Sequence, residues 1–167
     1  MTQSVPEMVL QGRRRGPGGR QPEQRIHRTR RETAQALSVV PLFGGFTKRD
    51  LNRLAEETDV VSFPAGATVV EEGLLGETMY VVLSGEAKVV QGTRRLGVVR
   101  PGDFFGEVAL LDGAPRSASV VAETRLVAIR LYRRTLFRTL EAEPQLALKI
   151  LDGLVRRVRA LSRPLDA

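Results

Sequence analysis

The sequence of 167 residues has no cysteine, no tryptophan and one histidine, His27. The absence of cysteine excludes disulfides, thiolate zinc sites, iron–sulfur clusters and cysteine nucleophiles, and it fits a reducing compartment. One histidine argues against a metal site made of histidines and against a histidine-based catalytic triad. Composition alone therefore excludes several classes of enzyme and metal protein.

Long apolar runs and enzyme signatures are also missing. No apolar run approaches the roughly 18 residues that a membrane-spanning helix needs, and the N-terminus lacks the apolar block of a secretory signal. The sequence has no P-loop, no Gly-x-Ser-x-Gly elbow, no His-Glu-x-x-His helix and no dinucleotide fingerprint. It predicts a cytoplasmic protein without a membrane partner, without enzyme activity and without a metal or other cofactor.

Positive charge is concentrated near the N-terminus. The net charge is +7, and residues 1–37 hold eight arginines and three glutamates. Residues 1–32 are rich in Gly, Pro, Gln and Arg without apolar periodicity, which predicts a basic, disordered tail. Such a tail can bind nucleic acid through charge, but it has no interleaved aromatics to stack on bases, so a solvated leader is the simpler interpretation. A true start at Met8 or later is a further alternative.

Residues 33–163 have the pattern of one domain, followed by a short tail of residues 164–167. Between residues 34 and 57, helical pieces are separated by a Pro-Gly break, and Thr47, with an aspartate three positions later, is typical of a helix N-cap. From residue 59 to residue 130, short β-branched runs alternate with glycine turns. This pattern predicts an all-β sandwich, roll or barrel.

The helical period returns at residue 132 and continues to about residue 162. A seam of apolar residues there steps by four and three positions: Ala147, Leu151, Leu154, Val158 and Leu161. Such a seam packs either on the helix's own domain or on a second copy of the chain, giving a homodimer, and both interpretations stay open. In that arrangement the neighbouring Leu148 and Val155 can face the β-domain.

The segment FFGEVALLDGAPRSASV, residues 104–120, places Glu107 and Arg116 nine positions apart among small and apolar residues. We expect a turn into a short helix, with Gly106 allowing close approach of the backbone to a ligand. A helix start, the arginine and the hydroxyl of Ser117 can converge on one anion, while the carboxylate accepts hydrogen bonds from neutral hydroxyls. A phosphate joined to a ribose is the simplest ligand with both features.

The run GEVALLDGAPRSASVVA closely resembles the phosphate-binding cassette of the cyclic nucleotide-binding domain family. Such modules occur in bacterial transcription regulators of the catabolite activator type, in protein kinase regulatory subunits and in gated channels. The resemblance spans about residues 38–162 and includes GETMYVVLSGEAKV as the preceding hairpin. It implies a mainly β fold, a jelly-roll-like β-roll (double-stranded β-helix) with flanking helices and a long C-terminal helix.

The resemblance also implies a function, the binding of cAMP or cGMP by a stand-alone regulatory module. Its C-terminal helix would signal to an unidentified protein partner. Glu107 would accept a hydrogen bond from the ribose 2′-hydroxyl, and Arg116 and Ser117 would bind the cyclic phosphate. Backbone N–H groups around Gly106, Val108 and Ala109 would complete the phosphate site.

The same resemblance implies a base pocket made of Val89, Leu96, Val99, Arg157, Leu161 and Ser162. Leu161 stands where the catabolite activator subgroup has a threonine, which removes a hydroxyl that reads the base. The identity of the base therefore stays open, with cAMP favoured by the subgroup resemblance.

Two alternatives remain beside nucleotide sensing. The chain ends five residues after Ser162, without the winged helix-turn-helix of catabolite-activator-type regulators, so direct sequence-specific DNA binding is not expected. A transcription regulator acting through a partner or its basic tail is one alternative. The other is a degenerate module that dimerises or docks without a ligand.

Overall fold

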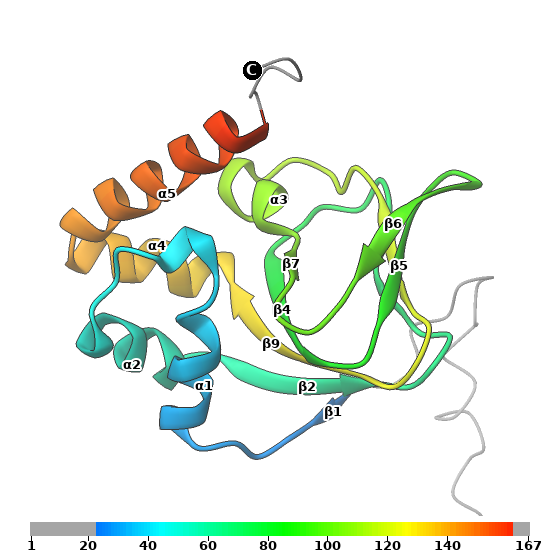
Figure 1. The fold of residues 1–167 in the computed structure, drawn as a ribbon, viewed down its shortest axis with the longest axis horizontal. Coiled ribbons are helices and arrows are strands. Elements are labelled where there is room, and N and C mark those ends of the chain that lie inside the picture. The colour runs from blue at the N-terminus through cyan, green and yellow to red at the C-terminus, as the bar shows by residue number, and fades with distance from the viewer. Residues whose placement is uncertain (1–22, 162–167) are drawn as a thin grey trace, which may run out of the picture.

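The computed structural model describes residues 23–161, with residues 157, 160 and 161 as backbone only. Within this part of the chain, nine strands form two antiparallel sheets (Figure 1). The first sheet has the order β1 (Gln24–Arg25), β2 (Asp59–Phe63), β9 (Leu126–Tyr132), β4 (Thr78–Ser84) and β7 (Phe104–Phe105). The second has the order β3 (Thr68–Val70), β8 (Ser119–Ala122), β5 (Ala87–Gln91) and β6 (Arg94–Val99). Most neighbouring strands are not consecutive in the chain, because the chain passes back and forth between the two sheets. This topology is that of the expected roll.

Helices precede and follow the strands, and one short helix interrupts them. Before β2 come α1 (Arg30–Leu37), the 3-10 helix η2 (Pro41–Phe43) and α2 (Lys48–Glu56). The short α3 (Glu107–Asp112) lies between β7 and β8, and α4 (Arg133–Ala142) and α5 (Gln145–Leu161) follow β9. Figure 1 shows α1, α2, α4 and α5 gathered on one side of the roll.

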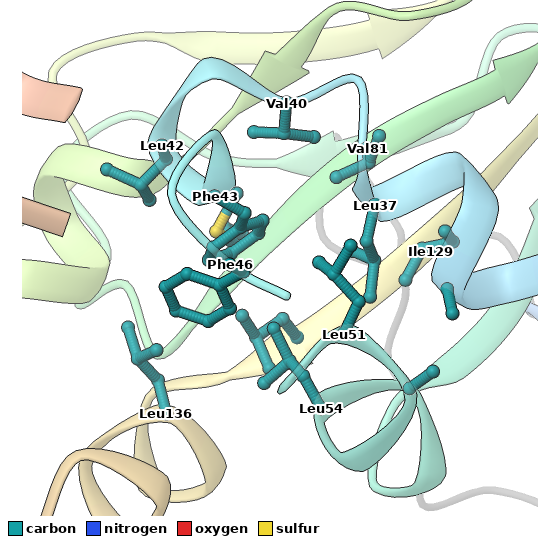
Figure 2. Packing of buried hydrophobic residues seen from close by; sticks show 14 of the residues in the cluster. Leu37, Val40, Leu42, Phe43, Phe46, Leu51, Leu54, Val81, Ile129 and Leu136 are labelled. Atoms are coloured by element: carbon teal, nitrogen blue, oxygen red, sulfur yellow. The ribbon is translucent and has the colours of Figure 1, made fainter. Parts of the chain in front are cut away.

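Three strands of the first sheet, β2, β9 and β4, have buried side chains on both faces. Successive side chains of a strand point to opposite sides, so each of these strands contributes to two apolar clusters. In β4, Met79 and Val81 pack among the helices, whereas Tyr80 and Val82 pack inside the roll. Figure 2 shows Val81 in the helix-side cluster, where fully buried Leu37, Leu54 and Leu136 join it. The two apolar clusters hold the helices and the roll together as one body.

The predicted N-cap of α2 is confirmed. The backbone N–H of Asp50 donates to the hydroxyl of Thr47 at 3.2 Å, and the N–H of Thr47 donates to the Asp50 carboxylate at 2.9 Å. This reciprocal pair satisfies N–H groups that a helix start leaves without helical partners.

The predicted tail is too long at its C-terminal end. Gln24 pairs with Ser62 across β1 and β2, and α1 begins at Arg30 rather than near residue 33. Two local features order this stretch: Thr29 and Glu32 form a capping box, and the Glu23 carboxylate pairs with buried Arg130. The Thr-x-x-Glu pattern was therefore a usable signal inside an otherwise basic segment.

The expected orientation of α5 is wrong. Leu148 and Val155 are exposed, at 69% and 43%, instead of facing the β-domain. The face of α5 that packs on the domain carries Leu146, Ile150 and Gly153, with Gly153 against η2. Of the predicted seam, Leu154 is half-buried, Ala147, Leu151 and Val158 are exposed, and the Leu161 side chain lies outside the description.

Candidate ligand-binding site

The segment predicted to bind a ligand begins with a strand rather than a turn. Phe104 and Phe105 form β7, paired with Val81 and Tyr80 of β4. The expectation that these residues start a turn is wrong, because they extend the first sheet by one short strand. The chain then turns at Gly106, whose φ of 86° lies in the left-handed region that favours glycine, and α3 follows directly.

A cavity of about 270 Å³ lies against this segment. Its lining includes all six residues that the sequence assigns to the sugar and phosphate: Gly106, Glu107, Val108, Ala109, Arg116 and Ser117. Val89 and Val99, two of the predicted base-pocket residues, also line it. The fold thus brings together residues from β5, β6, α3 and the stretch before β8.

Of the four remaining base-pocket residues, the described structure places only the Leu96 side chain. Leu96 of β6 does not line it and is 48% exposed. Arg157 and Leu161 belong to α5, but their side chains lie outside the description, and so does Ser162.

Arg116 is the central charge of the cavity. Its side chain is buried, and one terminal nitrogen donates to the carbonyl oxygen and the hydroxyl of Thr78, at 2.7 and 3.0 Å. The other donates to the carbonyl oxygen of Gly106 at 3.2 Å. These are neutral acceptors, and within the described residues no carboxylate lies within 4.0 Å of the guanidinium nitrogens.

Burial lowers the pKa of Arg116, while the nearby Tyr80 and Glu107 act in the opposite direction. An arginine nevertheless stays protonated in proteins. A buried cation that is bonded to neutral groups alone carries a large desolvation cost, which a bound anion would offset. The geometry therefore provides an anion site in which the guanidinium is already held in place.

Glu107 and the start of α3 form the other wall. Glu107 is buried, with 8% of its surface exposed. The first helical hydrogen bond of α3 runs from the N–H of Leu110 to the carbonyl oxygen of Gly106, at 3.1 Å. The N–H groups of Val108 and Ala109 thus precede the first helical hydrogen bond and can donate toward the cavity. Donors for an anion and a carboxylate acceptor for hydroxyls border the same space.

Two residues that the sequence did not assign to the site hold Arg116 in position. Thr78 supplies two of its three acceptors. Gly76 leaves room for it, since a Cβ at Gly76 would lie 2.6 Å from both the Arg116 Nε and the Ala109 Cβ. Both belong to the GETMYVV stretch, which precedes Arg116 by almost 40 residues, so local patterns around the arginine do not reveal them.

A larger cavity of about 530 Å³ also borders Arg116, on the side of Tyr80 and Arg130. Its rim carries the exposed Glu71 and Glu77 together with Glu23. These carboxylates would repel an anion, and Arg130 already pairs with Glu23 and Asp59. Glu107 and Asp112 line the smaller cavity as well, but backbone N–H groups at the start of α3 also border it, so it is the better anion site.

The described part of the chain shows neither a metal-binding cluster nor a membrane-spanning helix. Residues 23–161 hold no cluster of three or more His, Asp or Glu side chains suited to a metal ion. None of the helices described is long and apolar enough to span a membrane.

Comparison with known proteins identifies the family of this chain. Residues 60–143 match the family model of the cyclic nucleotide-binding domain. A cAMP-dependent protein kinase regulatory subunit from Aspergillus fumigatus is 44% identical over 101 residues, which are 58% of this chain and 24% of that protein. A CRP-like cAMP-activated global transcriptional regulator from Mycobacterium tuberculosis is 30% identical over 132 residues, 75% of this chain and 58% of that protein.

A crystal structure of a cyclic nucleotide-binding domain from Methylobacillus flagellatus superposes with a TM-score of 0.73 at 25% identity, covering 95% of this chain and 90% of that one. The fold is a β-roll with a cavity beside Arg116, and the chain belongs to the cyclic nucleotide-binding domain family. The predicted family and fold class are thus confirmed. The chain spans less than two thirds of the length of the two curated relatives.

Proposed function

We propose that this chain binds a cyclic nucleotide in the 270 Å³ cavity and acts as a regulatory module without catalytic activity. The observation that carries the proposal is the buried Arg116, held by Thr78 and Gly106 with no carboxylate partner among the described residues. A cyclic phosphate carries a single negative charge and can therefore serve as the anionic partner of this guanidinium.

Each wall of the cavity has a role in this proposal. Arg116 and the hydroxyl of Ser117 bind the exocyclic phosphate oxygens, with N–H groups of Val108 and Ala109 as further donors. Glu107 accepts a hydrogen bond from the ribose 2′-hydroxyl. The carboxylate thereby selects a ribonucleotide, since a bare phosphate would gain nothing from a negative neighbour.

We favour cAMP over cGMP as the ligand. Both curated relatives described above carry cAMP in their names. Val89 and Val99 offer the base apolar contact only, so neither of these two described residues can distinguish adenine from guanine by a hydrogen bond. The preference for adenine or guanine therefore depends on contacts beyond these two valines.

We propose that the C-terminal helix α5 transmits nucleotide binding to a partner. Leu148, Leu151, Val155 and Val158 are all exposed and step by three, four and three positions along α5. This spacing is that of a helix that pairs with another helix. We infer that α5 meets a second copy of the chain, and that nucleotide binding acts on this pairing through differential contacts in the bound and free states.

A second candidate function rests on the same exposed face. A module that dimerises through α5 without any ligand would also place these four side chains at an interface. Isothermal titration of the wild-type chain with cAMP and with cGMP separates the two candidates. Binding below the millimolar range supports the sensor. A folded dimer that binds neither nucleotide, and whose melting temperature neither nucleotide changes, supports the second function and contradicts the first.

A further inference from the structure

The stretch that carries Arg116 and Ser117 leaves the second sheet just where it borders the cavity. The ladder between β5 and β8 runs from the pair Ala87–Ala122 to the pair Val90–Ser119 and ends there. The residues before Ser119 are thus not held by β5 through its backbone. They line the cavity instead, as Pro115, Arg116, Ser117 and Ala118.

Beyond the end of the backbone ladder, a side chain of β5 forms the next hydrogen bond to this stretch. The amide nitrogen of Gln91, the last residue of β5, donates to the carbonyl oxygen of Ser117 at 3.0 Å. A peptide unit is planar and trans, so fixing this carbonyl also fixes the direction of the N–H of Ala118. The Gln91 side chain thereby sets the orientation of a peptide group in the wall of the cavity.

The turn beside Gln91 is itself anchored. The N–H of Gly92 donates to the Glu72 carboxylate at 2.8 Å, and the N–H of Glu72 donates to the hydroxyl of Ser119 at 2.9 Å. On the other side of the stretch, the backbone of Arg116 exchanges hydrogen bonds with Gly73 and Leu74, at 2.9 and 2.8 Å. Arg116 is therefore fixed by backbone bonds, whereas the Ser117 carbonyl is held by the Gln91 side chain.

We propose that Gln91 is a positioning residue for the phosphate end of the bound nucleotide. It does not line the cavity and acts through the peptide group of Ser117 and Ala118. The inference rests on the proposed function and deepens it. It distinguishes the two ends of the ligand, because the ribose end depends on Glu107 of α3, whereas the Gln91 side chain donates to the Ser117 carbonyl oxygen at the phosphate end.

The test replaces Gln91 by methionine, which has a similar shape, no charge and no N–H donor. Gln35→Met, at an exposed position of α1, is the matched control. Losing one solvent-accessible hydrogen bond should weaken cAMP binding by about threefold to tenfold in Gln91→Met and leave the control unchanged.

Ligand analogues separate a positioning role from a general loss of structure. In Gln91→Met the affinity ratio of the two phosphorothioate diastereomers of cAMP should change by about threefold, since sulfur replaces one or the other phosphate oxygen. The ratio between cAMP and its 2′-deoxy analogue should stay within about twofold of wild type, because that contact lies at the ribose end. In the ligand-free protein, hydrogen exchange of the Ala118 amide should be faster in the variant.

The outcomes are distinguishable. Wild-type affinity, wild-type diastereomer ratio and unchanged Ala118 exchange in Gln91→Met would overturn the inference and leave the proposed function intact. Equal losses for all analogues would also overturn it, since they indicate a general disturbance. A wild-type chain that binds no cyclic nucleotide would overturn the proposed function and this inference with it.

Discussion

Arg116 and Thr78 are 38 positions apart, and the guanidinium of one donates to both the hydroxyl and the carbonyl oxygen of the other. Thr78 is the first residue of β4, and Arg116 follows α3, so the contact joins the first sheet to the ligand-binding segment. The arginine is thereby oriented by neutral groups that leave its charge for a ligand. A prearranged donor of this kind loses little conformational freedom when the ligand binds.

Replacing Gly76 by alanine should displace Arg116. The added Cβ would lie 2.6 Å from the Arg116 Nε and from the Ala109 Cβ, closer than packed atoms allow. We expect a loss of nucleotide affinity of at least about tenfold, because a charge-assisted contact is disturbed. Gly97→Ala is the control, since a Cβ there would have no neighbour within 4 Å. Equal affinities for both variants in isothermal titration would show that Gly76 does not fix the arginine.

Replacing Leu136 by alanine should lower the stability of the domain without altering the residues that line the cavity. Leu136 is fully buried in the helix-side cluster shown in Figure 2. Such truncations typically cost about 2–5 kcal/mol of unfolding free energy. Leu96→Ala, at a half-exposed position, should change it by less than about 0.5 kcal/mol. Urea unfolding followed by circular dichroism measures both, and a small effect at Leu136 would contradict the described core.

Asp50 should make stability depend on pH in the acid range. Burial raises the pKa of its carboxyl, but hydrogen bonds from the Thr47 N–H and from Lys149 outweigh this and leave the pKa below its usual value. The stabilisation is therefore present above the unfolded-state pKa of about 3.9 and is lost as pH falls through the lower folded-state pKa.

In Asp50→Asn the unfolding free energy should be lower at neutral pH and should fall less steeply on acidification than in wild type. Asp152→Asn, exposed on α5, serves as the control and should keep the wild-type slope. Urea titrations at a series of pH values provide the measurement. A slope for Asp50→Asn equal to that of wild type would argue against the described network.

The exposed face of α5 should control self-association. Leu151→Glu places a charge in the apolar row, where pairing of two helices would bury it at high cost. We expect sedimentation velocity to show a dimer for wild type and a monomer for Leu151→Glu. Gln145→Glu adds the same charge at the start of α5 and should remain dimeric. A monomeric wild type would rule out pairing of α5 with a second copy.

Features that depend on a few neighbouring residues were accessible from the sequence. The Thr47 cap and the short helix of the segment 104–120 each follow from residues within one or two turns. The cavity between Glu107 and Arg116 was also predictable, because both residues belong to one continuous motif. The resemblance added the roll, which glycine turns and short strands alone left undecided among β folds.

Features that depend on distant contacts were not accessible in the same way. The support of Arg116 by Thr78 and Gly76 arises only when β4 packs beside α3. The sequence does not reveal the buried face of α5, because several apolar rows run along this helix. Packing on η2 selects the row with Leu146 and Ile150. The capping box at Thr29 is a local exception: its Thr-x-x-Glu pattern is visible in the sequence, but the basic composition around it suggests disorder.

The measurement that tests the central claim most directly is isothermal titration of cAMP and cGMP into wild type, Arg116→Ala and Arg134→Ala. Arg134, exposed on α4, is the matched control for loss of one guanidinium. The account predicts that wild type and Arg134→Ala bind at least one nucleotide below the millimolar range, and that Arg116→Ala binds it at least about tenfold more weakly while remaining folded. A folded wild-type chain that binds neither nucleotide, or an Arg116→Ala variant with wild-type affinity, would contradict it.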